Sequence, residues 1–129
     1  MQLWCRMEFK DPLTERIIGC AIEVHRSLGP GLLEKVYQKG LCVEFDFNQI
    51  SYEYQRHIPV FHRGVIVGDF YPDFIVAGEV VVEVKCTSAN EPFFDAQTLS
   101  YLRLTKAKKA LLLNFGRPVL KDGIKRFIL

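Results

Sequence analysis

The chain has 129 residues, 49% of them apolar, and its 17 basic residues nearly balance 15 acidic ones for a net charge of +2. This length and composition predict one domain with a sizeable core, and the small net charge excludes a strong overall field that attracts polyanions. Any contact with nucleic acid must therefore come from a local patch of charge.

Two helices are expected in the first third of the chain. Asp11-Pro12 is a typical helix start, and apolar residues then recur at helical spacing to about Leu28. Gly29-Pro30-Gly31 ends this helix, because glycine can take left-handed geometry and proline cannot continue the hydrogen-bond ladder. A second helix is expected from about Leu33 to Phe45, and its inward side is predicted to be Leu33, Val36, Tyr37, Gly40 and Leu41.

From Ile50 the pattern changes to short strands. Residues 52–54, 58–61 and 65–67 indicate an antiparallel meander. Two further strands, about Phe70 to Val76 and Val80 to Cys86, flank a tight turn at residues 77–79. The last elements expected are a crossover helix from about Phe93 to Leu104, an apolar strand from Ala110 to Phe115, and a segment from Ile124 to Leu129.

The strand from Val80 to Cys86 carries two charges in an otherwise apolar run. Glu83 and Lys85 lie two positions apart, so the period of a strand places both on one face. Charged residues are rarely buried unless they are paired or bind a metal. Asp73 is the natural partner, because a three-residue turn at 77–79 pairs Val76 with Val80 and sets Asp73 directly opposite Glu83.

This constellation leaves two interpretations open. Two facing carboxylates repel each other, but they can bracket a hard divalent cation with their oxygens. A two-residue turn would instead place Asp73 opposite a valine and weaken the direct pairing with Glu83. The second interpretation is an ion pair of Lys85 with Glu83 or with Asp73 at a sheet edge.

Several motifs together carry a resemblance to a known family. Pro72-Asp73 followed by Glu83-Val84-Lys85 matches the PD-(D/E)xK signature, and residues 31–37 read G-x-x-E-x-x-Y. Residues 95–102 resemble the Q-x-x-x-Y-L helix of RecB-like relatives, and residues 112–116 and 123–126 match the closing strands. From about Leu13 the chain is similar to the GxxExxY family of the PD-(D/E)xK nuclease-like superfamily. Residues 1–129 are then one domain, with 1–10 as an N-terminal extension.

The resemblance implies a mixed α/β (α+β) fold with a restriction-endonuclease-like core, in which helices flank a central mixed β-sheet in the order αβββαβ. It implies that Asp73 and Glu83 bind Mg²⁺ or Mn²⁺ and that Lys85 orients the attacking water and offsets charge on the scissile phosphate. Glu34 would be a further metal ligand, directly or through water, although by itself it is typical of a solvated helix charge. Residues on the helices complete the site: Gln97 would position substrate or water, and Tyr37 and Tyr101 would brace it. One departure is visible, since many relatives carry histidine where this chain has Phe94.

The expected function is therefore metal-dependent hydrolysis of phosphodiester bonds in DNA, with RNA as the second choice. The alternative is a catalytically silent nuclease fold that binds nucleic acid or regulates a protein partner, because fold and motif do not guarantee turnover. The short chain has little surface to wrap a duplex, which favours a homodimer or a partner. Basic residues would supply phosphate contacts if they converged on the site: Lys106, Lys108, Lys109, Arg117, Lys121, Lys125 and Arg126.

The cysteines and apolar runs indicate a compartment. Cys5, Cys20, Cys42 and Cys86 form no C-x-x-C pair, which argues against a structural zinc site, and we expect reduced, mostly buried thiols. No segment has the pattern of a signal peptide, and no apolar run approaches the ~20 residues of a membrane helix. These features predict a cytoplasmic protein without a membrane span.

Overall fold

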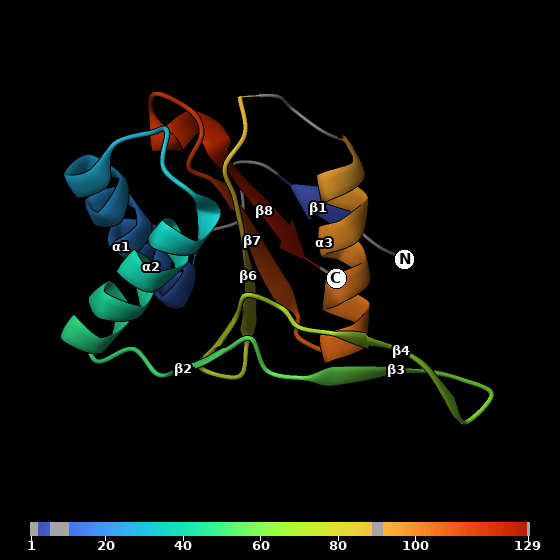
Figure 1. Ribbon diagram of the computed structural model, residues 1–129. Coiled ribbons are helices and arrows are strands. Elements are labelled where there is room, and N and C mark those ends of the chain that lie inside the picture. Colours follow the sequence, from blue (N-terminus) through green and yellow to red (C-terminus); the bar gives the residue numbers. More distant parts are fainter. Residues whose placement is uncertain (1–2, 6–10, 89–91, 129) are drawn as a thin grey trace.

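A central mixed sheet with helices on both faces forms the body of the protein (Figure 1). The computed structural model describes residues 3–5, 11–88 and 92–128, and within these ranges the sheet has six strands in the order β1-β8-β7-β6-β5-β2. The β6 and β7 strands are parallel and the other neighbours are antiparallel. The elements are β1 (Leu3–Cys5), α1 (Pro12–Leu28), α2 (Glu34–Phe47), β2 (Tyr52–Tyr54), β3 (Ile58–His62), β4 (Val65–Phe70), β5 (Phe74–Val76), β6 (Val80–Lys85), α3 (Pro92–Thr105), β7 (Lys109–Asn114), η1 (Leu120–Gly123) and β8 (Ile124–Ile128).

The expected αβββαβ order is present when β3 and β4, which lie outside the six-stranded sheet, are left out. After the helices come β2, β5 and β6, then α3 and β7. The α3 helix is the crossover that makes β6 and β7 parallel, as a connection between parallel neighbours requires. The restriction-endonuclease-like fold class is thus confirmed, with β1 and β8 added at one edge.

The first helix begins and ends where its caps predict. Asp11 accepts hydrogen bonds from the backbone N–H groups of Leu13 and Thr14, both at 3.0 Å, which satisfies two of the free donors at a helix start. Gly29 follows the helix with φ of 72°, a conformation that glycine takes without a steric penalty.

The predicted inward side of the second helix is partly wrong. Tyr37 and Leu41 are buried, but Leu33 is 78% exposed and Val36 is 40% exposed. The buried stripe instead runs along Tyr37, Leu41 and Phe45, which are spaced four residues apart, and Leu33 precedes the first helical residue. Gly40 faces α1 closely, since a Cβ there would lie 2.9 Å from Val24 Cγ1.

The alternation of side chains along β6 divides the core into two layers. Val80, Val82 and Val84 pack on the α1 and α2 side. Val81 packs with Leu102 of α3 on the opposite side. Glu83 and Lys85 share the parity of Val81 and therefore lie on the face that α3 covers.

The strand predicted from Phe70 to Val76 is two strands in the structure. The β4 strand ends at Phe70 and β5 begins at Phe74, because Pro72 has no N–H to donate to a ladder and the N–H of Asp73 donates to a side chain. The strand predicted to reach Cys86 ends at Lys85.

The predicted meander is also wrong in its pairing. The β2 strand joins the main sheet beside β5, whereas β3 and β4 form a separate hairpin, which extends from the body at the lower right of Figure 1.

Other expectations concern the thiols and the membrane. Cys20 is buried, Cys42 and Cys86 are half-buried, and all three are free thiols, whereas the side chain of Cys5 lies outside the described part of the structure. A search of the described residues finds no helix whose length and apolar character would let it cross a membrane. Leu129 lies beyond the described ranges, and the single-domain boundary stays a prediction.

Candidate functional site

The facing of Asp73 and Glu83 rests on the turn between β5 and β6. Val76 pairs with Val80, and Phe74 pairs with Val82, so the two-residue turn is wrong. Asp73 and Glu83 are the residues next to the Phe74–Val82 pair. Asp73 N donates to Glu83 Oε2 at 2.9 Å, and Val84 N donates to Asp73 Oδ2 at 2.8 Å. Each carboxylate thus accepts from a backbone N–H opposite it, and the facing of Asp73 and Glu83 agrees with the sequence prediction.

Burial makes it costly to charge both carboxylates together. Glu83 is 4% exposed, and this burial raises its pKa to about 8, with a further rise from the charge of Asp73. Burial likewise raises the pKa of Asp73 to about 6, against the hydrogen bond from Val84 and with a further rise from Glu34. These raised pKa values disfavour two negative charges on the pair near neutral pH, and a bound divalent cation would favour them.

Lys85 lies two residues after Glu83, at the end of β6. Its Nζ is 4.7 Å from the centroid of the Phe94 ring on α3, within the range of a cation–π contact. Among the described residues Lys85 forms no ion pair with a carboxylate, so the structure does not show the alternative in which it pairs with Asp73 or Glu83. Sequence reasoning missed Phe94 as the platform for this lysine.

Glu34 is the first residue of α2 and is exposed. Partial burial of its carboxyl raises the pKa of Glu34, and the charge of Lys85 opposes that rise, which places Glu34 near the end of β6. Within the described ranges, however, no three His, Cys, Asp or Glu side chains lie together as a metal site. The structure does not bring Glu34 into a three-carboxylate cluster, so its role as a ligand stays a prediction.

Tyr37 holds the turn that precedes Glu34. Its hydroxyl donates to the carbonyl oxygen of Gly29 and accepts from Leu32 N at 3.1 Å. The ring stacks on Phe115 with centroids 4.7 Å apart. Tyr37 therefore fixes the start of α2 from the buried side, and its role in bracing the site stays a prediction.

Gln97 and Tyr101 approach the carboxylates from α3. Gln97 Oε1 is buried, and no hydrogen-bond donor reaches it from the residues that the structure describes. Burial and then the charges of Glu83 and Asp73 raise the pKa of Tyr101, while a hydrogen bond with the Gln97 side chain opposes the rise. Tyr101 also stacks on Phe70 at the base of the hairpin, with centroids 4.1 Å apart.

These residues fit a divalent cation. Within the described structure, Asp73 Oδ1 and Glu83 Oε1 take no hydrogen bond, so each carboxylate keeps one oxygen for a ligand. Carboxylate oxygens suit Mg²⁺ and Mn²⁺, and Mg²⁺ usually binds one or two carboxylates and retains several waters. The buried Gln97 Oε1, which lacks a donor, is the acceptor that such waters would satisfy.

Most of the predicted basic residues lie away from this site or are held in ion pairs. Lys106 and Lys108 lie beside Gly78, at the end of β6 opposite to Lys85. Others are held in ion pairs: Lys109 with Asp11 at 3.0 Å, Lys125 with Asp95 at 2.8 Å and Arg126 with Glu15 at 3.2 Å. Lys121 lines a hollow with His25 and Arg26.

A different pair of cations gathers around Tyr54, and the charge of one of them, Lys35, opposes the rise in the pKa of Asp73. Lys35 Nζ donates to the Tyr54 hydroxyl at 3.2 Å, and Lys39 Nζ is 5.0 Å from the centroid of the same ring. The sequence carries one signal for this pair, since lysines four residues apart share a helical face. It carries no local signal for Tyr54, which reaches them only through the fold.

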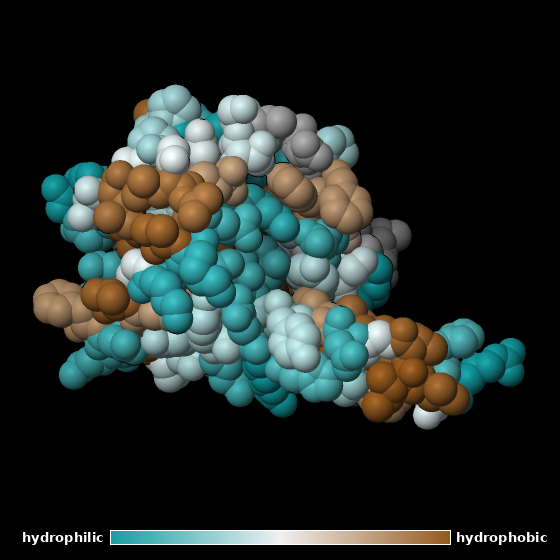
Figure 2. Space-filling view, viewed as in Figure 1, coloured by the Kyte–Doolittle hydropathy of each residue, from teal (hydrophilic) through white to brown (hydrophobic). Residues whose placement is uncertain are grey.

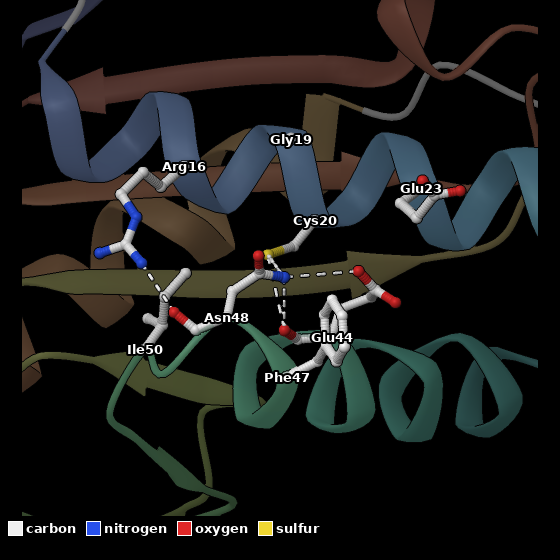
Figure 3. A pocket seen from close by; sticks show the side chains of 8 residues that line it. All are labelled: Arg16, Gly19, Cys20, Glu23, Glu44, Phe47, Asn48 and Ile50. Carbon is white, nitrogen blue, oxygen red and sulfur yellow. Dashed lines mark hydrogen bonds between the residues drawn. The ribbon is translucent and has the colours of Figure 1, made fainter.

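A separate pocket lies between α1 and α2 (Figure 3). Side chains that line it form hydrogen bonds with other residues of the same pocket. Arg16 donates to Asn48 O at 2.8 Å, and the Asn48 amide donates to Glu44 O at 2.8 Å. None of the residues that line it is a predicted site residue.

Comparison with known proteins addresses the resemblance. The family model of the PD-(D/E)XK nuclease superfamily matches residues 11–127, which includes every predicted site residue. The match does not resolve the GxxExxY family within the superfamily. No curated protein and no solved structure matches the chain significantly.

Proposed function

We propose, since this chain belongs to the PD-(D/E)XK nuclease superfamily, that it is a nuclease that hydrolyses phosphodiester bonds with a divalent cation, Mg²⁺ or Mn²⁺, beside Asp73 and Glu83. The observation that carries this proposal is the facing pair of carboxylates, half-buried Asp73 and buried Glu83, with Lys85 two residues further along the same strand face. DNA is the proposed substrate, with RNA second. Little of so short a chain can wrap a duplex, which favours action as a homodimer or with a protein partner.

Each residue has a distinct part in the proposed reaction. Asp73 and Glu83 would hold the cation, which when bound lowers the pKa of water and offsets charge on a phosphate. The Lys85 ammonium would orient the attacking water and balance the charge that develops on the phosphate oxygens. Gln97 Oε1 would accept a hydrogen bond from water or substrate, and Glu34 would act from the start of α2 through water.

The test compares wild type with Lys85→Met and Asp73→Asn. Labelled single-stranded and double-stranded DNA and RNA are incubated with Mg²⁺, Mn²⁺ or chelator. Lys85→Met should keep its fold and its cation affinity but lose roughly 10²–10³ in cleavage rate, since one such electrostatic contact can contribute that much. Asp73→Asn should lose cleavage and cation binding together.

Cation binding is measured separately from cleavage. Added Mn²⁺ should raise the thermal midpoint of wild type and of Lys85→Met, because a ligand of the folded state stabilises it, and should not raise that of Asp73→Asn. Cleavage that survives in both variants would identify a contaminating nuclease. Cation binding by a wild type that cleaves no substrate would favour the silent, nucleic-acid-binding alternative.

A further inference from the structure

Two lysines of α2 gather around one tyrosine of β2. Lys35 and Lys39 are both exposed and lie one helical turn apart. Their ammonium nitrogens lie 5.6 Å and 5.0 Å from the centroid of the Tyr54 ring. The Tyr54 hydroxyl donates to Gln38 Oε1 at 2.8 Å, so its oxygen is oriented to accept from Lys35.

These two charges lack the partners that other cations of the protein have. In the described structure, neither Lys35 nor Lys39 forms an ion pair with a carboxylate, whereas Lys109 and Lys125 each do. Two ammonium groups beside one ring repel each other, and an anion between them would remove that repulsion. The arrangement is therefore suited to an anionic ligand.

Lys35 lies near the carboxylate pair, and Lys39 lies beside the same Tyr54 ring one turn further along α2. Tyr54 pairs with Phe74 in the sheet, and the next N–H, of Gln55, donates to Asp73 O at 3.0 Å. Burial raises the pKa of Asp73, and the nearby charge of Lys35 opposes that rise. Figure 2 shows a hydrophilic band in this view, between an apolar surface over the start of α2 and another over the β3–β4 hairpin. The exposed apolar residues of these surfaces are Leu32, Leu33 and Val36, and Phe61, Val65, Ile66 and Val67.

We propose that Lys35 and Lys39 form a subsite for a backbone phosphate of the nucleic-acid strand, next to the phosphate that is cleaved. This inference rests on the proposed function and specifies where the substrate strand lies beside the carboxylates. Lysine ammoniums act as point charges on phosphate, and contacts to phosphate carry no direct sequence information, so we expect the subsite to accept any sequence. It also supplies a local positive patch, which contact with nucleic acid requires because the net charge of the whole chain is only +2.

The test measures binding in chelator, where cleavage cannot occur. Fluorescence anisotropy follows a labelled single-stranded oligonucleotide at several salt concentrations. The variants are Lys35→Gln/Lys39→Gln and the charge-preserving Lys35→Arg/Lys39→Arg, and Lys108→Gln is the control, an exposed lysine at the other end of β6. The plot of log affinity against log salt should become shallower by about 0.7 in the Gln pair, the value for one phosphate contact on a single strand, and stay unchanged in the other two variants.

The outcomes separate this subsite from the nuclease activity. A wild-type slope in the Gln pair, an equal change in Lys108→Gln, or no salt-dependent binding by wild type would overturn the subsite. If wild type cleaves nothing but the slopes change as expected, the nuclease proposal fails and the phosphate subsite stands. If wild type cleaves and the Gln pair binds and cleaves like wild type, the nuclease proposal stands and the subsite is overturned.

Discussion

Glu83 and Asp73 should make the stability of the protein depend on pH. Burial raises the pKa of these carboxyls to about 8 and about 6, so the folded state keeps protons that the unfolded chain releases near their ordinary values of 4.5 and 3.8. Because the folded state binds more protons in this window, the free energy of unfolding should fall as pH rises from about 4 to about 8. The fall should be on the order of a few kcal/mol, since one pKa unit corresponds to about 1.4 kcal/mol.

Urea unfolding in chelator at several pH values across that window measures the effect. Glu83→Gln should remove most of the slope, and the exposed Glu79→Gln should leave it unchanged. Mn²⁺ should reduce the fall, because the cation binds the ionised carboxylates and its affinity rises with pH. A stability that does not change with pH in wild type would contradict the raised pKa values.

Phe94 should position Lys85 for its part in cleavage. The ammonium of Lys85 lies 4.7 Å from the ring centroid, and a cation–π contact is worth about 0.5–2 kcal/mol. Phe94→Leu keeps an apolar side chain and should lower kcat roughly 2- to 30-fold, at about 1.4 kcal/mol for each factor of ten. Cation affinity should not change.

Phe93→Leu is the matched control, because Phe93 is adjacent to Phe94 in the sequence and is 64% exposed. Steady-state kinetics on the best substrate compare the two variants. Equal losses in both would mean that the start of α3, rather than the cation–π contact, determines the rate.

The facing of Asp73 and Glu83 was predictable because a short turn relates strands that are neighbours in sequence. The contact between Lys85 and Phe94 was not, since it depends on where α3 crosses the sheet. The G-x-x-E-x-x-Y pattern likewise placed Glu34 and Tyr37 near the start of one helix but did not give the distance from Glu34 to the carboxylates. Tertiary geometry decides that distance.

The conformation of the turn between α1 and α2 should affect the proposed cation site. Gly31 has φ of 99°, which favours glycine, and the Tyr37 hydroxyl holds Gly29 O and Leu32 N on either side of it. Tyr37→Phe leaves both backbone groups without this partner and should cost about 1–3 kcal/mol of stability. The start of α2, which carries Glu34, would then be less well fixed.

A double-mutant cycle on Mn²⁺ affinity tests that coupling. Glu34→Gln should weaken Mn²⁺ binding roughly 10-fold, as loss of a group that acts through water commonly does. Tyr37→Phe should weaken it less, and the double variant no more than Glu34→Gln alone, because both changes act through one carboxylate. Tyr71→Phe, on an exposed ring, is the control. Strictly additive losses would show that Tyr37 does not act through Glu34.

Element boundaries were predictable where local chemistry sets them. Asp11 and Gly29 define α1 by capping, and the structure agrees. The strand across Pro72 was wrong because the apolar pattern outweighed the missing N–H in the prediction. The β3–β4 hairpin was assigned to a meander because local alternation does not say which strands pair.

At the scale of the whole molecule, the parallel pairing of β6 and β7 builds the site. The connection through α3 returns the chain across the face of the sheet that carries Glu83 and Lys85. Gln97, Tyr101 and Phe94 reach that face for this reason. The opposite face belongs to α2, whose first turn brings Glu34 and Lys35 toward the same end of β6. The site therefore lies where the two helical layers meet the end of one strand.

The N-terminal strand should stabilise the sheet without contributing to the site. The family match begins at residue 11, yet β1 pairs with β8 through Leu3↔Ile128, Trp4↔Phe127 and Cys5↔Arg126. This pairing lies at the β1 edge of the sheet, which β8 and β7 separate from β6. Deletion of residues 1–10 should therefore lower the free energy of unfolding by about 1–3 kcal/mol, the value of a few ladder hydrogen bonds. The rise in thermal midpoint with Mn²⁺ should be the same as in the full chain.

Circular dichroism must follow unfolding of both proteins, because Trp4 is the sole tryptophan and the deletion removes it. In the full chain, amide hydrogen exchange of residues 3–5 reports separately on β1. If β1 is an added edge strand, these amides should exchange faster than those of the central strands, because few contacts hold a strand of three residues at the end of a sheet. A shortened chain that fails to fold, or that folds but no longer responds to Mn²⁺, would show that the domain needs its first ten residues.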